Sequence, residues 1–230
     1  MSISNQQLET WAHQGSITQS SDTYSAIKNT LKADNNPYFD KDYEVFLQGS
    51  YGNDTNIYAE SDVDVVIRLN DCFQHDLDGL PKEQQEAFHA VHSNAIYTGA
   101  DFKNDVFSVL KAKYGQDAKI GDKAIKIEAN GNRRKSDVIV AIQFRRYHKF
   151  LAINNQSYDL GISFFNKTGE RIVNYPKQHL KNCTTKHQNS QKWCKPMARI
   201  FKNLRNKMIS EKMIADDLAP SYYLEGLLYN

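Results

Sequence analysis

The sequence predicts an α+β fold in which a mixed sheet is flanked by helices and followed by a helical lobe. Three observations point to this class. Helical patterns open and close the chain, strands rich in Val, Ile and Phe lie between them, and the glycine-containing pairs 130–131 and 168–169 have the composition of hairpin turns. With 230 residues, the chain is long enough to bury a sizeable core.

The expected elements follow in order from the N-terminus. A helical region over 2–32 is expected, with Ser20 and Ser21 as caps for its second half. A strand over 43–49 and a second over 62–69 should be neighbours, with the Gly49–Ser50 turn at one end. Amphipathic helices and two hairpins come next, over 81–95, 101–115, 123–147 and 161–175, and the remainder is expected to be helical.

Composition and charge exclude several classes of protein. The formal net charge of +2 is nearly balanced, although the segment 177–207 carries nine Lys and Arg and no acid, which is an attractor for phosphate. The cysteines are too few and too scattered for a disulfide framework: Cys72, Cys183 and Cys194. No segment approaches the roughly 20 apolar residues of a membrane span. We therefore expect a cytoplasmic protein without a membrane partner.

Two carboxylates lie among the valines of the second strand. Side chains alternate along a strand, so Asp62 and Asp64 share one face, where their charges repel unless a cation compensates. A third acid, Asp137, opens the β-branched run "DVIVAIQF". We expect this run to lie beside the Asp62/Asp64 strand with its carboxylate at the same end. The three carboxylates would then converge.

Three converging carboxylates are the requirement for two Mg²⁺ or Mn²⁺ ions about 3.5–4 Å apart, which activate a hydroxyl nucleophile and bridge a nucleoside triphosphate. The Gly49–Ser50 turn complements them, because glycine admits a phosphate close to the backbone and the Ser50 hydroxyl donates to it. An isolated Asp-x-Asp or Gly-Ser pair is commonly structural. Eleven residues between the two pairs, with a later acid on a strand, favour catalysis.

Several motifs in this order resemble a known family over residues 20 to 230. The segments "GSYGNDTNIYAESDVDVVIRL", "KSDVIVA", "NYPKQH", "KPMARIFKNLRNKM" and "PSYYLEGLLYN" resemble the bacterial cGAS/DncV-like nucleotidyltransferases (CD-NTases) of the polymerase β-like superfamily. The resemblance is greatest to the subgroup whose products often contain pyrimidines. It implies a two-lobed enzyme that makes cyclic di- or trinucleotides from nucleoside triphosphates, and whose product acts on an effector protein encoded elsewhere in CBASS-type anti-phage signalling.

The resemblance also implies roles and boundaries. Asp62, Asp64 and Asp137 would be the catalytic metal ligands, Ser50 of the Gly49–Ser50 turn would hold the donor triphosphate, and Gln48 would add a polar contact. The catalytic core with its N-terminal helices would span 1–175 and the helical lobe 176–230. Because the chain ends inside the apolar helical pattern "SYYLEGLLYN" while relatives continue, we expect that lobe to be incomplete.

A basic helix and a Ser-Tyr pair extend the expected nucleotide site. Lys195, Arg199 and Lys202 recur at i, i+4 and i+7, so they form one cationic stripe of a helix. A solvated face is the alternative, but beside the three acids the stripe is expected to face the triphosphate. Ser221 and Tyr222 match the family's phosphate-binding Ser and base-stacking Tyr; a capping Ser and a core Tyr are the alternative.

Base choice is expected to depend on Asn174. The resemblance places the strand "ERIVNY" beside the nucleotide cleft, and an amide can pair with the acceptor and donor of uracil, so UTP joins ATP and GTP as an expected substrate. Alternatively, Asn174 caps the turn before Pro176.

Alternative functions and sites remain open at this point. The spacing of His179, Cys183, His187 and Cys194 is not a recognised zinc pattern, so we expect no zinc there. The same metal chemistry would serve a nucleotidyltransferase that modifies an RNA end, a small molecule or a protein. A non-catalytic module that binds nucleic acid through the basic segment is a further alternative, which the retention of all three Asp disfavours, so a nucleic-acid partner is not expected.

Overall fold

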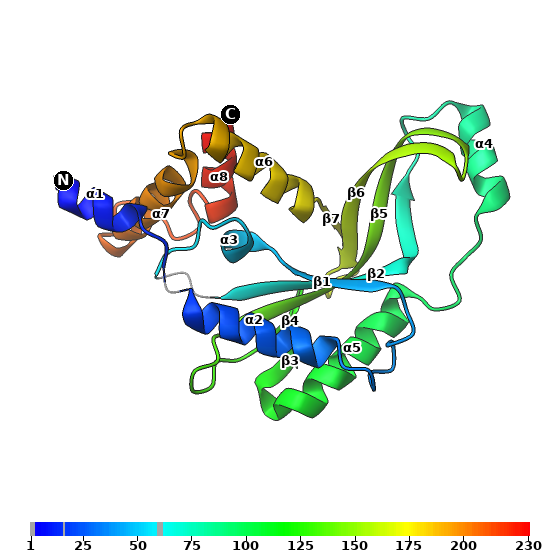
Figure 1. Ribbon diagram of the computed structural model, residues 1–230, viewed down its shortest axis with the longest axis horizontal. Coiled ribbons are helices and arrows are strands. Elements are labelled where there is room, and N and C mark those ends of the chain that lie inside the picture. The colour runs from blue at the N-terminus through cyan, green and yellow to red at the C-terminus, as the bar shows by residue number, and fades with distance from the viewer. Residues whose placement is uncertain (1–2, 16, 59–61) are drawn as a thin grey trace.

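A single mixed sheet organises the chain in the computed structural model, which describes residues 3–15, 17–58 and 62–230 (Figure 1). Within these ranges, seven strands form the sheet, with β1, β2, β5, β4 and β3 side by side and β6 and β7 continuing from β5. The strands are β1 (Tyr43–Leu47), β2 (Val63–Asp76), β3 (Ala118–Ile120), β4 (Ile125–Ile127), β5 (Ser136–Ala152), β6 (Asn155–Phe165) and β7 (Arg171–Asn174). The predicted α+β class is confirmed.

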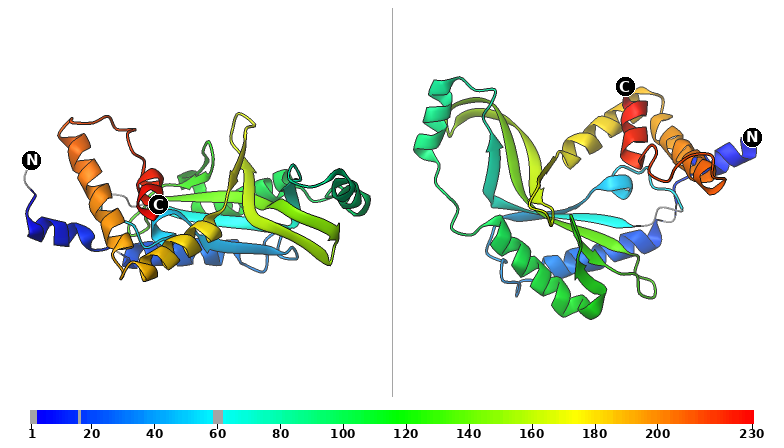
Figure 2. Two further views of the ribbon diagram at one scale, coloured as in Figure 1. Left: turned by 90° about the horizontal axis from the view of Figure 1, so that it is seen from above. Right: turned by 180° about the vertical axis from the view of Figure 1, so that it is seen from behind.

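Helices lie on both sides of this sheet. Figures 1 and 2 show α2 and α5 against one face, and α6, α7 and α8 grouped on the other side near the short α3. The helices are α1 (Asn5–Ala12), α2 (Thr18–Leu31), α3 (Gly49–Gly52), α4 (Lys82–Val91), α5 (Gly99–Tyr114), α6 (Pro176–Asn189), α7 (Cys194–Ser210) and α8 (Ser221–Tyr229). In the described ranges, no helix combines the length and apolar character that a membrane crossing needs.

The core lies between the sheet and the pair α2/α5. Alternate side chains of β2 and β5 face these helices and are buried, as the period of two requires. Members of this cluster include Val65, Ile67, Val138 and Val140 from the strands and Ile27, Leu31, Val106 and Leu110 from the helices. Because a one-residue slip would turn this apolar set away from the core, the packing also determines where the Asp side chains lie.

The parallel pairing of β2 with β5 is the feature that positions the site. Strand β1 runs antiparallel to β2, and β2 runs parallel to β5 with Val63 opposite Ser136 and Asp64 opposite Asp137. The expected neighbouring of these strands is confirmed. So are the two hairpins, in which β4 pairs with β5 and β6 pairs with β7.

One local prediction was wrong, and one feature of the sheet was not predicted. Ser20 and Ser21 do not cap a helix, because α2 already begins at Thr18 and the Ser21 amide donates to the Ile17 carbonyl as part of the helix. The strand that opens near Asp137 also continues to Ala152 and forms a long hairpin with β6, which was not predicted. Its outer half, "RRYHKF", mixes charged and aromatic residues and lacks the apolar run that marks a strand.

Candidate active site

Three carboxylates meet at the edge of the sheet where β2 and β5 begin. Asp64 and Asp137 occupy directly paired positions on the two parallel strands, and Asp62 immediately precedes β2. The Lys135 ammonium donates to Asp62 Oδ2 at 3.0 Å, which partly neutralises the outermost carboxylate. The sequence folds this way because β-branched residues follow each Asp and commit both segments to buried strands.

The electrostatics of this group call for a cation. Burial first, then the charges of Asp137 and Asp62, raise the pKa of Asp64 to about 7. Burial likewise raises the pKa of Asp137, against the nearby Lys126, and its buried Oδ1 finds no hydrogen-bond partner in the described part of the chain. Carboxylates at the start of two paired strands, one of them with an unsatisfied buried acceptor, are a donor set that suits Mg²⁺ or Mn²⁺. These residues therefore fit a divalent metal site.

Gly49 is required by the close approach of Asp64. Its φ of +67° favours glycine, and a Cβ there would lie 2.2 Å from Asp64 Oδ2. The backbone amide of Gln48 donates to the Asp64 carbonyl at 3.0 Å, so the turn is fixed to the start of β2. The sequence argument assigned this glycine to phosphate binding; the structure adds that any side chain here would displace a carboxylate.

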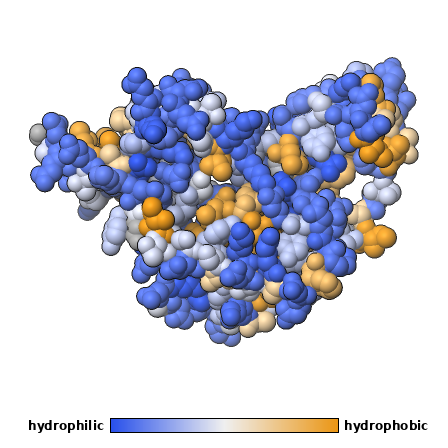
Figure 3. All heavy atoms as spheres, viewed as in Figure 1, coloured by the Kyte–Doolittle hydropathy of each residue, from blue (hydrophilic) through white to orange (hydrophobic). Residues whose placement is uncertain are grey.

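A cavity of about 620 Å³ opens beside these carboxylates. Figure 3 shows the surrounding face as largely hydrophilic and hollowed between the helices α6–α8 and the β5–β6 hairpin. Nine residues expected at the site line the cavity: Gln48, Gly49, Ser50, Asp62, Asp64, Asn174, Lys202, Ser221 and Tyr222. Five residues that were not predicted line it as well: Asn53, Tyr175, Pro176, His179 and Glu225. Asp137, Lys195 and Arg199 are not among the lining residues.

The expected cationic stripe of α7 is divided between two environments. Lys195 donates to Asp54 Oδ2 at 2.7 Å, whereas Arg199 donates to the carbonyls of Ala12 and Asp54, each at 2.6 Å. These two cations hold the loop after α3 and the end of α1. Of the three, only Lys202 reaches the cavity, because helical spacing sets which residues share a face but not which way the folded helix turns that face.

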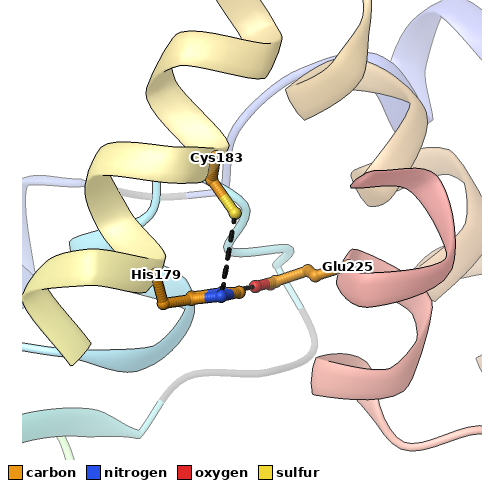
Figure 4. A group of neighbouring side chains, drawn as sticks. All are labelled: His179, Cys183 and Glu225. Atoms are coloured by element: carbon orange, nitrogen blue, oxygen red, sulfur yellow. Dashed lines mark hydrogen bonds and ion pairs between the residues drawn. The ribbon is translucent and has the colours of Figure 1, made fainter. Parts of the chain in front are cut away.

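Glu225 is the principal site residue that sequence reasoning missed. It is buried at the cavity and accepts hydrogen bonds from the side chains of four residues: Asn53, Thr55, His179 and Lys202. Figure 4 shows His179 of α6 pointing at this carboxylate on α8. The available signal was a lone acid inside the apolar helix "SYYLEGLLY", since such an acid needs a buried partner.

The charges in this network have shifted pKa values. Cys183 first, then Glu225, raise the pKa of His179 to about 9, against the effect of burial. Burial alone would raise the pKa of Glu225, but His179, Lys202 and Thr55 together lower it to about 2. At neutral pH the network therefore holds an imidazolium, a carboxylate and an ammonium.

We expect His179→Gln to remove a pH-dependent part of the stability. A histidine whose folded pKa exceeds its unfolded value stabilises the fold below about pH 6.5, and this contribution is lost as pH rises through about 9. Urea unfolding of both proteins at about pH 6 and about pH 9.5 should show the wild-type advantage shrinking by on the order of 2 kcal/mol. A difference that stays constant across this range would contradict the charged state of His179.

Comparisons with known proteins agree with this geometry. The family model for the cGAS/DncV-like nucleotidyltransferase C-terminal helical domain matches residues 181–230. A cyclic UMP-AMP synthase of Rhodothermus marinus is 40% identical over 232 residues, which cover all of this chain and 77% of that relative. A cyclic dipurine nucleotide synthase of Elizabethkingia meningoseptica is 31% identical and is covered to the same extents, 100% and 77%.

A solved structure extends the likeness to the fold. The structure of the Rhodothermus marinus c-UMP-AMP synthase with Apcpp and Upnpp superimposes with a TM-score of 0.84 at 39% identity, covering 100% of this chain and 75% of that one. The sequence identity, the extent of coverage and the shared mixed sheet flanked by helices all point the same way. This chain belongs to the cGAS/DncV-like nucleotidyltransferases (CD-NTases), a family of enzymes.

Proposed function

We propose that this enzyme joins nucleoside triphosphates into cyclic di- or trinucleotides in a reaction that depends on Mg²⁺ or Mn²⁺. The observation that carries the proposal is the meeting of Asp62, Asp64 and Asp137 at one sheet edge, beside a cavity large enough for a nucleotide. The names of the relatives, which are cyclic nucleotide synthases, support the product class.

Residues in the cavity and beside it would bind different parts of the substrate. Asp62, Asp64 and Asp137 would hold the metal ions, which when bound supply activation of a hydroxyl nucleophile and neutralisation of phosphate charge. The Ser50 hydroxyl would donate to the donor triphosphate from the helical turn α3. Tyr222, which is 70% exposed and lines the cavity, would stack on a base. Together these contacts would orient the phosphate for attack.

Residues of α7 and α8 would have two further roles. Ser221 accepts a hydrogen bond from Arg205 and lines the cavity, where its hydroxyl would contact a phosphate of the bound nucleotide. Lys195 and Arg199 would contribute indirectly, because they fix Asp54 in the loop that carries Asn53. The family-model match to 181–230 supports a helical lobe over 176–230 and a catalytic core over 1–175.

The biological setting follows from the product class. We propose that the cyclic nucleotide is a cytoplasmic second messenger in CBASS-type anti-phage signalling and that it acts on an effector protein encoded elsewhere. UTP is proposed as one substrate beside ATP and GTP, which the name of the Rhodothermus marinus relative supports.

Pyrophosphate release provides the test of this function. The purified protein, given nucleoside triphosphates and Mg²⁺ without any other acceptor, should release pyrophosphate, and chelation of the metal should stop the release. If release requires an added RNA end, small molecule or protein, the enzyme transfers nucleotides to that acceptor instead. If no condition gives release while the protein binds nucleic acid with steep salt dependence, the chain is a binding module.

Replacing Asn174 is expected to change base choice. Asn174 ends β7 and lines the cavity, where its amide would pair with the Watson–Crick edge of uracil. Asn174 is exposed in the protein without nucleotide, and a bound base would cover it. An amide that is covered but left unpaired by a wrong base costs about 1–3 kcal/mol, which is a tenfold or larger preference. Asn174→Ser should therefore shift incorporation from UTP toward purines in equimolar nucleotides. An unchanged product ratio would assign base choice to other residues.

A further inference from the structure

Glu225 is the centre of a hydrogen-bonded cluster at the inner wall of the cavity. The ligand atoms of His179, Cys183 and Glu225 lie within 4.8 Å of one another, which is a spacing that a metal ion can bridge. The carboxylate is already satisfied, because Oε1 accepts from Thr55 and Lys202 while Oε2 accepts from Asn53 and His179. An added cation would also face the Lys202 ammonium, 2.7 Å from Oε1. The cluster is complete without an ion.

Lys202 is fully committed within this cluster. Its side chain is entirely buried, and its ammonium donates to the Thr55 carbonyl at 3.1 Å, to Thr55 Oγ1 at 3.2 Å and to Glu225 Oε1 at 2.7 Å. An ammonium has three donors, so none remains for a ligand. Glu225 therefore offsets most of the charge that Lys202 would otherwise present to a triphosphate.

His179 connects the same carboxylate to the exposed tyrosine of the cavity. Its Nε2 lies 3.1 Å from Glu225 Oε2 and 3.5 Å from Cys183 Sγ, so two buried side chains fix the position of this ring nitrogen. The ring centroids of His179 and Tyr222 are 4.9 Å apart with an interplanar angle of 35°. Tyr222 is the second residue of α8 and has most of its surface exposed, so the histidine supports one side of a largely exposed ring.

These contacts form a chain from a buried anion to the proposed base-binding ring. We propose that Glu225 and His179 are positioning residues for base binding: Glu225 orients His179, and His179 holds Tyr222 where a nucleotide base stacks on it. This inference rests on the proposed function, since it assigns the base of a nucleoside triphosphate to this wall. The triphosphate is assigned to other residues, namely Ser50, Ser221 and the three carboxylates.

The assignment separates base binding from phosphate binding. Loss of His179 leaves Tyr222 unsupported, so it weakens binding of a nucleotide but leaves binding of inorganic tripolyphosphate unchanged. Loss of the Glu225 charge also frees the Lys202 ammonium, so Glu225→Gln weakens nucleotide binding without weakening tripolyphosphate binding. A residue that only stabilised the fold would lower both affinities together.

Calorimetric titration with Mg²⁺ and two probes, a non-hydrolysable UTP analogue and inorganic tripolyphosphate, tests this proposal. His179→Gln and Tyr222→Ala should each lower the affinity for the UTP analogue about tenfold. The affinity for tripolyphosphate should stay within about twofold of the wild-type value. The double variant should bind the UTP analogue no more weakly than Tyr222→Ala alone, because His179 acts through Tyr222. His187→Gln, on the same helix but outside the cavity lining, is the matched control and should change neither affinity.

Two results would overturn the inference. One is that His179→Gln lowers the affinity for both probes equally, and the other is that the affinity losses of the single variants multiply in the double variant. Both variants alter side chains at the cavity surface, so the test stands even if Glu225→Gln fails to fold. Failure of the proposed function is distinguishable, because it appears as missing pyrophosphate release by the wild-type protein without an added acceptor, whatever the affinities of the variants. If the wild-type protein binds the UTP analogue and the affinity losses of the two single variants multiply in the double variant, only the inference about His179 is rejected.

Discussion

Asp62→Asn combined with Asp64→Asn is expected to reduce product formation below detection while leaving the fold intact. The two carboxylates lie with Asp137 at one sheet edge, where they would hold the ions that the reaction requires. Asn keeps the size of each side chain but removes the charge. Product formation is measured with labelled nucleoside triphosphates, and Asp78→Asn, an exposed acid just beyond β2, is the control that should retain activity.

The same double variant is expected to be more stable than the wild type when no metal is bound. The folded pKa of Asp64 is raised from 3.8 to about 7, so its ionised form destabilises the fold increasingly as pH rises from about 4 to 7. Urea unfolding in a chelator at about pH 8 should show a gain on the order of 1 kcal/mol, which falls toward zero near pH 4. Wild-type turnover by the folded double variant would reject the metal assignment.

Lys202→Ala is expected to be the most destabilising single change in the helical part. It leaves Glu225 buried with one cation fewer, and breaking a buried pair in this way costs about 3–5 kcal/mol. The double variant Lys202→Met with Glu225→Gln removes both charges, so it should recover a large part of that loss. Chemical denaturation of the wild type, Lys202→Met, Glu225→Gln and the double variant gives the coupling free energy directly.

A matched control exists on the same helix. Lys207 forms an i,i+4 ion pair with Glu211 at 2.6 Å, but both side chains are exposed by more than a third. Lys207→Ala should therefore change the free energy of unfolding by less than about 1 kcal/mol. If Lys202→Ala costs no more than Lys207→Ala, the buried pair does not contribute as the structure implies.

The arrangement of the acids was predictable because it follows from local rules. A period of two places Asp62 and Asp64 on one face, and the β-branched run after Asp137 identifies a buried strand. The Gly49–Ser50 turn was also found, since its residue types are distinctive. Its contact with Asp64 was not, because the approach of a side chain to a backbone depends on the folded path of both segments.

The helical wall of the cavity was less predictable from the sequence. The spacing of Lys195, Arg199 and Lys202 correctly indicated one helix, but the orientation of α7 is set by its packing against α1 and the loop after α3. Glu225 has no pattern around it: its partners Thr55 and His179 are distant in sequence. A buried network assembled from four segments leaves almost no periodic signal in any of them.

The most direct test of the central claim is the mass of the product. The wild-type protein is incubated with ATP, GTP, CTP and UTP and Mg²⁺, treated with phosphatase, and the resistant material is analysed by mass spectrometry. The proposed function predicts a cyclic di- or trinucleotide that contains uridine monophosphate and is absent with Asp62→Asn/Asp64→Asn. Linear products only, or a resistant product that the double variant still makes, would contradict it.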